Sequence, residues 1–246
     1  MGYIGEMILK STTAIPLRGL RSLRGIRERL AGKEHALRQD LVRFGKLLHT
    51  QGFVAATDGN LSVRLDDDRL LVTPTCFSKG MMKPEDMAVV DMQGKKLSGH
   101  YKPSSEITMH LTIYRMRPDV GAVVHAHPCT ATAFASAGLA LDEPLCSEVV
   151  ITLGEVPLAP YATTGTSELS NSLRPFIPYH NAILMANHGV VTYGENLCRA
   201  YMRMEAVEHF AKIVLATRQL GSACSLNSRE VEKLVEARVQ YAKNGR

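Results

Sequence analysis

The sequence predicts an α/β fold in which helices cover both faces of a β-sheet. Short apolar or alternating runs bounded by turn residues, such as 61–65 and 70–72, predict strands. Longer runs with apolar residues three and four positions apart predict helices interspersed among those strands. A hydrophobic content of 45% and a charged content of 22% are ordinary for a soluble globular enzyme.

The first half of the predicted domain begins with one helix, which three strands follow. A helix at 33–50 places Leu37, Leu41, Phe44 and Leu48 on one face and ends at Gly52. The turn signal at 58–60 then introduces the first strand. The predicted strands are Leu61–Leu65, Leu70–Val72 and Met87–Met92.

The second half is predicted to be richer in helices. Residues 130–138 and a short segment from Ser167 are expected to be helical, followed by the long helix Leu197–Leu220 and a last helix, Ser228–Tyr241. The long helix should bury Tyr201, Met204, Phe210 and Leu215. Strands are expected at Val149–Leu153, Val156–Ala159 and Ile183–His188.

The apolar run 123–128 contains two histidines separated by one residue. If the run is a strand, His125 and His127 point to the same face with Cα atoms about 6–7 Å apart, close enough to bind one transition metal. A pair of structural histidines is the alternative. A third histidine, His188, ends another apolar run in Asn-His-Gly, where strand tips commonly carry sites. Three histidines fit a catalytic metal with one open coordination position.

The segment 103–106 precedes a helical run and indicates a helix N-terminus. Hydroxyl groups at such a position cap the helix, and its N–H groups accept an anion. Capping alone is the simpler interpretation, and Glu106 would also suit the helix dipole without any catalysis. His110 lies one turn further on the same face and is interpreted as a packing or orienting residue.

The net charge of +5 is concentrated at the N-terminus. Residues 1–33 hold seven of the 29 basic residues but only two of the 24 acidic ones, so the remainder is neutral and gives no indication of nucleic-acid binding. Apolar residues three and four apart predict a basic amphipathic helix within residues 1–32. That extension either docks on its own domain or a neighbouring subunit, contacts a membrane surface or acidic partner, or serves as a transit peptide. Residues 33–246 form the predicted domain.

The cysteines and the hydropathy of the sequence indicate the cellular compartment of the protein. Five cysteines are scattered without any Cys-x-x-Cys, which predicts reduced thiols in the cytoplasm. No apolar run reaches the ~20 residues that a membrane-spanning helix needs.

Six short motifs in this order resemble the class II aldolase and adducin head-domain family, from about Lys33 to the C-terminus. The family includes the L-fuculose-phosphate and rhamnulose-phosphate aldolases. Each motif is weak alone, and the set in this order and spacing is distinctive. The motifs are Gly59-Asn60-Leu61-Ser62, Thr73-Pro74-Thr75, Pro103-Ser104-Ser105-Glu106, His125-Ala126-His127, Ala159-Pro160-Tyr161-Ala162 and Asn187-His188-Gly189.

The resemblance implies a three-layer α/β/α domain with a mainly antiparallel sheet, usually a homotetramer with active sites between subunits. It implies that His125, His127 and His188 bind Zn²⁺, although Mn²⁺ and Co²⁺ accept the same ligands. Glu106 would be the catalytic acid/base, and Tyr241 matches a tyrosine implicated in donating a proton. The residues that match the phosphate site are Asn60, Thr75, Cys76, Ser104 and Ser105.

Three departures from the family pattern accompany the resemblance. Cys76 stands where the aldolases usually have glycine in the phosphate loop. The segment 145–148 offers no tyrosine where the aldolases place one from the neighbouring subunit. The basic extension lies outside the matched region.

The resemblance implies a metal-dependent aldolase that cleaves a sugar-phosphate-like hydroxy-ketone through a metal-stabilised enediolate. A dehydratase and a pentose-phosphate 4-epimerase share this fold, but the epimerases usually carry Asp at the position of Glu106. A non-catalytic adducin-like module is the alternative from a different class. The intact histidines and Glu106 favour an enzyme.

Overall fold

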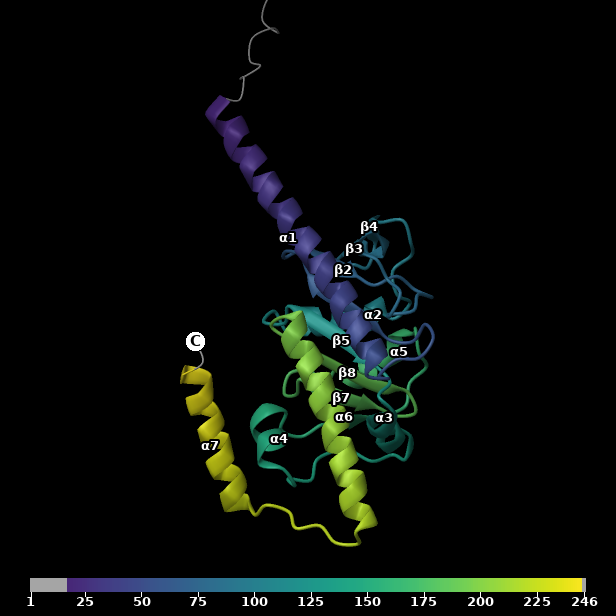
Figure 1. Cartoon of the computed structure of the whole chain (residues 1–246), viewed down its shortest axis with the longest axis vertical. Helices are drawn as coiled ribbons and strands as arrows, with labels where there is room; N and C mark the ends of the chain where they lie inside the picture. The colour runs from purple at the N-terminus through teal and green to yellow at the C-terminus, as the bar shows by residue number, and fades with distance from the viewer. Residues whose placement is uncertain (1–16, 245–246) are drawn as a thin grey trace, which may run out of the picture. The chain divides into compact units, whose positions relative to one another are not determined.

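The central element of the structure is one eight-stranded sheet (Figure 1). This computed structural model describes residues 17–244, and within them the side chains of residues 31–237 and 239. The strand order is β4-β3-β2-β1-β5-β8-β7-β6, and every pairing is antiparallel except that of β6 with β7. The strands are β1 (Asn60–Arg64), β2 (Arg69–Val72), β3 (Ala88–Asp91), β4 (Lys96–Ser98), β5 (Ala122–Ala126), β6 (Leu158–Ala159), β7 (Ala182–Met185) and β8 (Gly189–Gly194).

Helices cover both faces of the sheet. One face packs against the part of α1 from Leu37 onward and against α3 and α6, whereas α2 and α5 cover the other. The helices are α1 (Leu17–Thr50), α2 (Ile107–Met116), α3 (Cys129–Ser136), α4 (Ser147–Thr152), α5 (Ser167–Leu173), α6 (Leu197–Gln219) and α7 (Ser228–Asn244), with a 3-10 turn at Pro84–Asp86. The predicted three-layer α/β/α class is confirmed.

Two apolar clusters form because strand side chains alternate between faces. Leu61 and Val63 of β1 and Val124 of β5 pack beneath α1 and α6. Their neighbours Val123 and Val191 enter the cluster beneath α2 and α5. Residues of β1 and β5 at alternate positions therefore reach the α2 side, where the candidate site lies.

The structure corrects three expectations. Residues 149–153, predicted as a strand from their β-branched composition, lie at the helix α4 and its C-terminal cap, because Val149 and Leu153 are one helical turn apart and both enter the core. Leu215, predicted to be buried, is 43% exposed on α6. Strand β8 was not predicted, although its Val-Val-Thr-Tyr run between two glycines carries a strand signal.

Helix α1 crosses the domain boundary that the sequence predicted at residue 32. Helix α1 continues without a break from Leu17 to Thr50, and the chain divides into two compact units, Met1–Ala36 and Leu37–Arg246. The side chains predicted to form the basic amphipathic face, within 17–30, lie outside the described residues. The separate character of residues 1–32 stays a prediction.

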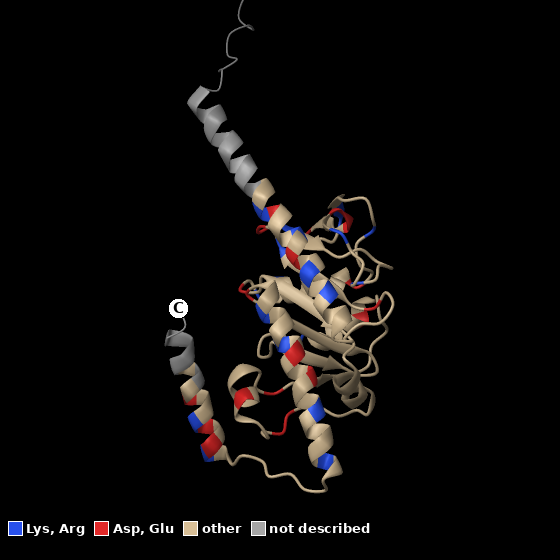
Figure 2. Cartoon of the chain, viewed as in Figure 1, with Lys and Arg blue, Asp and Glu red and all other residues tan. Residues whose placement is uncertain are grey.

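Charge is distributed with both signs on the helices. Figure 2 shows basic and acidic side chains interspersed along α6 and along the described part of α1. Among the described helices, none combines the length and the hydropathy needed to cross a membrane.

Candidate active site

The first candidate ligand, His125, lies at the end of β5. Its register partner on the neighbouring strand is Asn60, so both side chains belong to the face that α2 covers. The imidazole is completely buried, and its Nδ1 donates a hydrogen bond to the carbonyl oxygen of Val190 at 2.9 Å. This bond leaves Nε2 as the nitrogen that faces the cluster.

The second histidine, His127, follows two residues later, where the chain has left the strand. Its backbone N–H donates to the carbonyl oxygen of Phe53 at 2.8 Å, and its Nε2 lies 3.1 Å from Nε2 of His125. Asp58 Oδ2 lies 3.5 Å from Nδ1 of His127 and so contacts this histidine on the ring nitrogen that faces away from His125. The sequence pattern had indicated only a turn at Asp58. Burial, with His125 and His188 nearby, lowers the pKa of His127 to about 4, so its ring is neutral at physiological pH.

The third histidine, His188, lies in the tight connection between β7 and β8. Asn187 adopts the left-handed conformation with φ of 55°, which asparagine tolerates well, and His188 N–H closes the turn on the carbonyl oxygen of Met185 at 3.0 Å. Gly189 follows, and a Cβ atom there would lie 2.5 Å from Cδ2 of His127. Glycine therefore lets β8 begin against the His127 ring.

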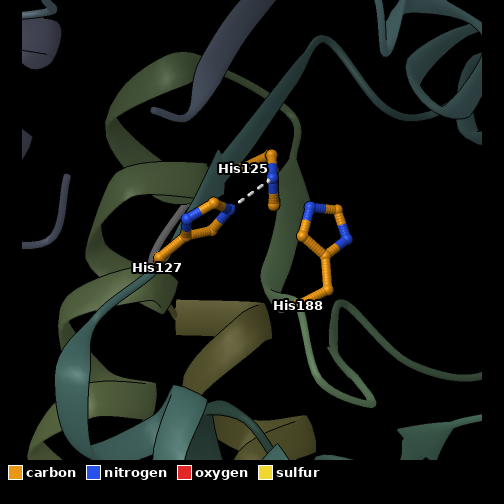
Figure 3. A group of neighbouring side chains, drawn as sticks. All are labelled: His125, His127 and His188. Carbon is orange, nitrogen blue, oxygen red and sulfur yellow. Dashed lines mark hydrogen bonds between the residues drawn. The ribbon is translucent and has the colours of Figure 1, made fainter. Parts of the chain in front are cut away.

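The three imidazoles converge from two segments of the chain, as Figure 3 shows. One ligand atom from each of His125, His127 and His188 lies within 4.8 Å of the others. Two nitrogens bound to one tetrahedral ion lie about 3.3 Å apart, close to the 3.1 Å between His125 and His127. Among the described residues, buried Nδ1 of His188 and Oε1 of Glu106 have no hydrogen-bond partner. These donors fit a divalent transition metal.

Glu106 lies at the N-cap position of α2, and its carboxylate reaches the histidines. Oε2 lies 3.3 Å from Nε2 of His125 and Oε1 lies 3.2 Å from Nε2 of His188. Burial alone would raise the pKa of Glu106, but the two imidazoles outweigh burial and hold that pKa far below its ordinary value. The carboxylate is therefore ionised and adjoins the candidate metal position.

A cavity of about 470 Å³ opens beside the histidines. Reciprocal backbone bonds, from Thr75 to the Lys102 carbonyl and from Ser104 to the Thr73 carbonyl, bring two of its walls together. His127, His188 and Glu106 line the cavity, whereas His125 lies buried behind it. The residues matched to the phosphate site also line it: Asn60, Thr75, Cys76, Ser104 and Ser105.

Two of these residues differ from their sequence-based interpretation in detail. Helix α2 begins at Ile107, and Ser104 Oγ accepts the N–H of the N-cap residue Glu106 at 3.3 Å, so neither serine caps the helix, and Ser105 stays exposed. Cys76 is exposed in the cavity wall with φ of 59°, a left-handed conformation that strains most residues other than glycine, asparagine and aspartate. Glycine, which the resemblance to the aldolases implies at this position, adopts that conformation freely.

Lys79 was missed by sequence reasoning. It is 1% exposed, and its Nζ donates to the carbonyl oxygens of Thr57 at 3.1 Å and Phe77 at 2.5 Å. Burial lowers the pKa of Lys79 to about 8. The ammonium joins the two loops that form the cavity wall at Thr57 and Cys76.

A second missed residue is Glu208 on α6, which is 3% exposed. Its carboxylate accepts the backbone N–H groups of Thr130 at 3.0 Å and Ala131 at 2.9 Å. The N-cap residue of α3 is Pro128, whose side chain makes no capping hydrogen bond. Glu208 on α6 therefore caps the N-terminus of α3 instead. Because α3 starts two residues after His127, this contact anchors the end of the histidine segment.

Tyr241, the matched proton donor, belongs to α7. Its side chain lies outside the described residues, and its catalytic role stays a prediction.

Comparisons with known proteins show which family this chain belongs to. Residues 39–215 match the family described as "Class II Aldolase and Adducin N-terminal domain". A 3-oxo-tetronate 4-phosphate decarboxylase from Pectobacterium atrosepticum is 37% identical over 185 residues, which cover 74% of this chain and 84% of the relative. A 5-deoxy-D-ribulose 1-phosphate aldolase from Bacillus thuringiensis is 33% identical over 201 residues, covering 81% and 93%.

A comparison with solved structures indicates the same family. YgbL from Klebsiella pneumoniae superimposes with a TM-score of 0.77 at 34% identity, covering 82% of this chain and 98% of that protein. The match of the family spans well over half of the chain and includes all three histidines and Glu106. The chain therefore belongs to the class II aldolase and adducin family.

Proposed function

We propose that this protein is a metal-dependent aldolase that cleaves a phosphorylated hydroxy-ketone of the sugar-phosphate class. The observation that carries the proposal is the position of the Glu106 carboxylate, held within 3.3 Å of two of three converging histidines at the edge of a cavity. A site that only bound metal would need no carboxylate between its ligands and the cavity.

The histidines and Glu106 divide the work. His125, His127 and His188 would hold the ion, and Zn²⁺ is the metal that three imidazoles with an open position favour. When bound, such an ion withdraws charge from the substrate oxygens and stabilises the negative charge that develops as the carbon–carbon bond breaks. Glu106 takes the proton from the substrate hydroxyl next to that bond and returns a proton to the ketone half.

The cavity wall supports a phosphate on the substrate. Thr75, Ser104 and Ser105 contribute hydroxyl groups around the start of α2, where the helix dipole favours an anion. The buried ammonium of Lys79 adds positive potential behind the same wall. Names of the relatives, which include a sugar 1-phosphate aldolase and an oxo-acid phosphate decarboxylase, agree with a phosphorylated substrate.

Decarboxylation of a phosphorylated 3-oxo acid is the second candidate. The similarity to a decarboxylase at 37% identity favours it. Loss of CO₂ leaves negative charge on the same ketone oxygen as aldol cleavage, so the same ligands serve both reactions. The two differ because decarboxylation requires no proton to be taken from a hydroxyl before the bond breaks.

The proposal extends to assembly and compartment. The side chains of all five cysteines are free, which supports a reducing compartment such as the cytoplasm. Two tyrosines, Tyr161 and Tyr179, are 65% and 82% exposed, and exposed aromatic residues are enriched at protein interfaces. We expect a homotetramer, which sedimentation equilibrium would test.

The test uses zinc-loaded protein and a panel of ketose phosphates and phosphorylated 3-oxo acids. Aldehyde release supports the aldolase, CO₂ release transfers the proposal to the second candidate, and absence of both contradicts an enzyme of either kind. Glu106→Gln should keep its metal while turnover falls ~10²–10⁴-fold, the usual contribution of a general acid–base. Glu85→Gln, at an exposed carboxylate in the first turn of the 3-10 helix Pro84–Asp86, is the matched control and should retain turnover.

A further inference from the structure

A line of buried polar side chains runs from the candidate site into the core between β1 and α2. Asn60 Nδ2 donates to Oε2 of Glu106 at 2.8 Å, and Asn60 Oδ1 lies 2.5 Å from Nε2 of His110. His110 Nδ1 lies 2.7 Å from Oγ of Ser62, whose hydroxyl and carbonyl oxygens each lie 3.0 Å from the hydroxyl group of Tyr114. The four residues behind Glu106 are at most 4% exposed.

Two periodicities build this line. Asn60 and Ser62 are alternate residues of β1 and therefore share a face. Glu106, His110 and Tyr114 recur every four residues along α2 and share the facing side of the helix. Each member of one set meets a member of the other.

We propose that His110 positions the catalytic carboxylate by fixing the orientation of the Asn60 side-chain amide, with Ser62 and Tyr114 fixing His110 in turn. The inference rests on the proposed catalytic role of Glu106. No residue beyond Asn60 touches the cavity, so His110 acts only through Asn60.

The direction of every bond follows from Glu106. An ionised carboxylate only accepts, so Asn60 must present its NH₂ group to Glu106 and its oxygen to His110. His110 must then carry its proton on Nε2, which leaves Nδ1 to accept the hydroxyl proton of Ser62. Tyr114 donates to Ser62 and ends the line.

Reversing the Asn60 amide would place two acceptors against each other. Its oxygen would face the Glu106 carboxylate, and its NH₂ group would meet the Nε2–H of His110. Burial raises the cost of such mismatches, because no water replaces the lost partners. His110 therefore supports one amide orientation and one position of Oε2 relative to His125.

The test compares metal-loaded variants at both ends of one contact. His110→Leu removes the donor to Asn60, and we expect kcat to fall ~10–100-fold, the range for outer-shell partners, with KM and metal content unchanged. His110→Gln returns an N–H donor and should recover most of kcat. In an Asn60→Ala background, His110→Leu should have no further effect, because its route to Glu106 is gone.

A structural role for His110 predicts different results. It would lower stability yet leave kcat of the folded enzyme intact, or would change kcat equally with and without Asn60, and either result overturns the proposal. If His110→Leu does not fold, Ser62→Ala replaces it, because losing the hydroxyl frees His110 to take the other tautomer; an unchanged kcat there also overturns the proposal.

A second measurement is independent of turnover. ¹⁵N spectra of histidine-labelled protein, assigned by loss of the signal in His110→Gln, should show His110 as the neutral Nε2–H tautomer. The Nδ1–H tautomer would overturn the proposed orientation. If wild-type protein turned over no tested substrate, the proposed function would fail while this spectrum still decided the direction of the bonds.

Discussion

Glu208 and Thr130 are 78 residues apart in sequence, yet the carboxylate of one accepts the backbone N–H of the other at 3.0 Å. The same carboxylate accepts Ala131 N–H and lies 3.4 Å from the ammonium group of Lys212. A buried negative charge thus meets the positive end of α3, which begins two residues after His127.

The variant Glu208→Gln should destabilise the fold by about 1–3 kcal/mol, because one amide oxygen replaces a charged group that accepts two N–H donors. Metal affinity should also fall, since the end of the His127 segment loses its anchor. Urea unfolding and metal titration check both effects. Lys212→Met, which removes only the 60% exposed partner, should change stability by less than about 1 kcal/mol.

Metal removal should expose the energetic link between the ion and the fold. We expect about one divalent ion per chain, and a chelator should lower the thermal midpoint because the ion binds only the folded site. His188→Ala should reduce metal content and abolish the chelator effect. His209→Ala, at an exposed histidine of α6, should behave like the wild type. Equal metal content in both variants would contradict the assigned ligands.

Replacing Cys76 with glycine should not reduce the stability of the protein. The φ of 59° at Cys76 costs roughly 1–2 kcal/mol in a residue with a Cβ, whereas glycine adopts it freely but loses about 0.5–1 kcal/mol through the unfolded chain. Cys76→Gly should therefore leave stability unchanged or raise it by up to about 1 kcal/mol. Cys76→Val, with a branched Cβ, should be destabilising. Equal urea midpoints for the glycine and valine variants would show that the strain is absent.

Acid should weaken the fold in part through His110. Burial, reinforced by His125, lowers the pKa of His110 to about 3 from an ordinary 6.5. Between those values the unfolded chain binds more protons than the folded one, so stability is complete above pH 6.5 and falls as the pH drops through this window. The His110 contribution reaches about 1.4 kcal/mol per pH unit. Metal-free His110→Gln should show a shallower pH dependence in urea unfolding than metal-free wild type.

Deletion of residues 1–30 should leave the metal site folded. The residues of α1 that enter the core, Leu41, Phe44 and Leu48, all lie downstream of the cut. Metal content and the urea midpoint of the truncated protein should match those of the full chain. Loss of either would make the extension an integral part of the domain.

The candidate site was predictable where local pattern determined position. The His-x-His spacing predicted that His125 and His127 lie together, which they do although His127 follows the end of β5, and Asn-His-Gly placed His188 in the turn after β7. Register between β1 and β5 then set Asn60 beside His125, which no single segment encodes. Glu208 escaped prediction for the same reason, since a buried acid on a helix has no local sign of the distant N–H groups that it caps.

Helix α4 was predicted wrongly for the opposite reason, because its local composition indicates another structure. The valines and isoleucine of 149–151 favour a strand by their composition. Packing decides otherwise, because Val149 and Leu153 reach the core only with helical spacing. The left-handed backbone of Cys76 is also set by its surroundings, since cysteine carries no signal for that conformation.

The three candidate ligands come from positions 125, 127 and 188, and Glu106 contacts His125 and His188 across 19 and 82 residues of sequence. Such a site does not exist until β5 has paired with β8, and we expect this long-range pairing to form late in folding. A metal ion should therefore leave the refolding rate almost unchanged and slow unfolding instead, since it stabilises contacts absent from the transition state. In the cell, metal supply would then govern the lifetime of this protein more than its rate of maturation.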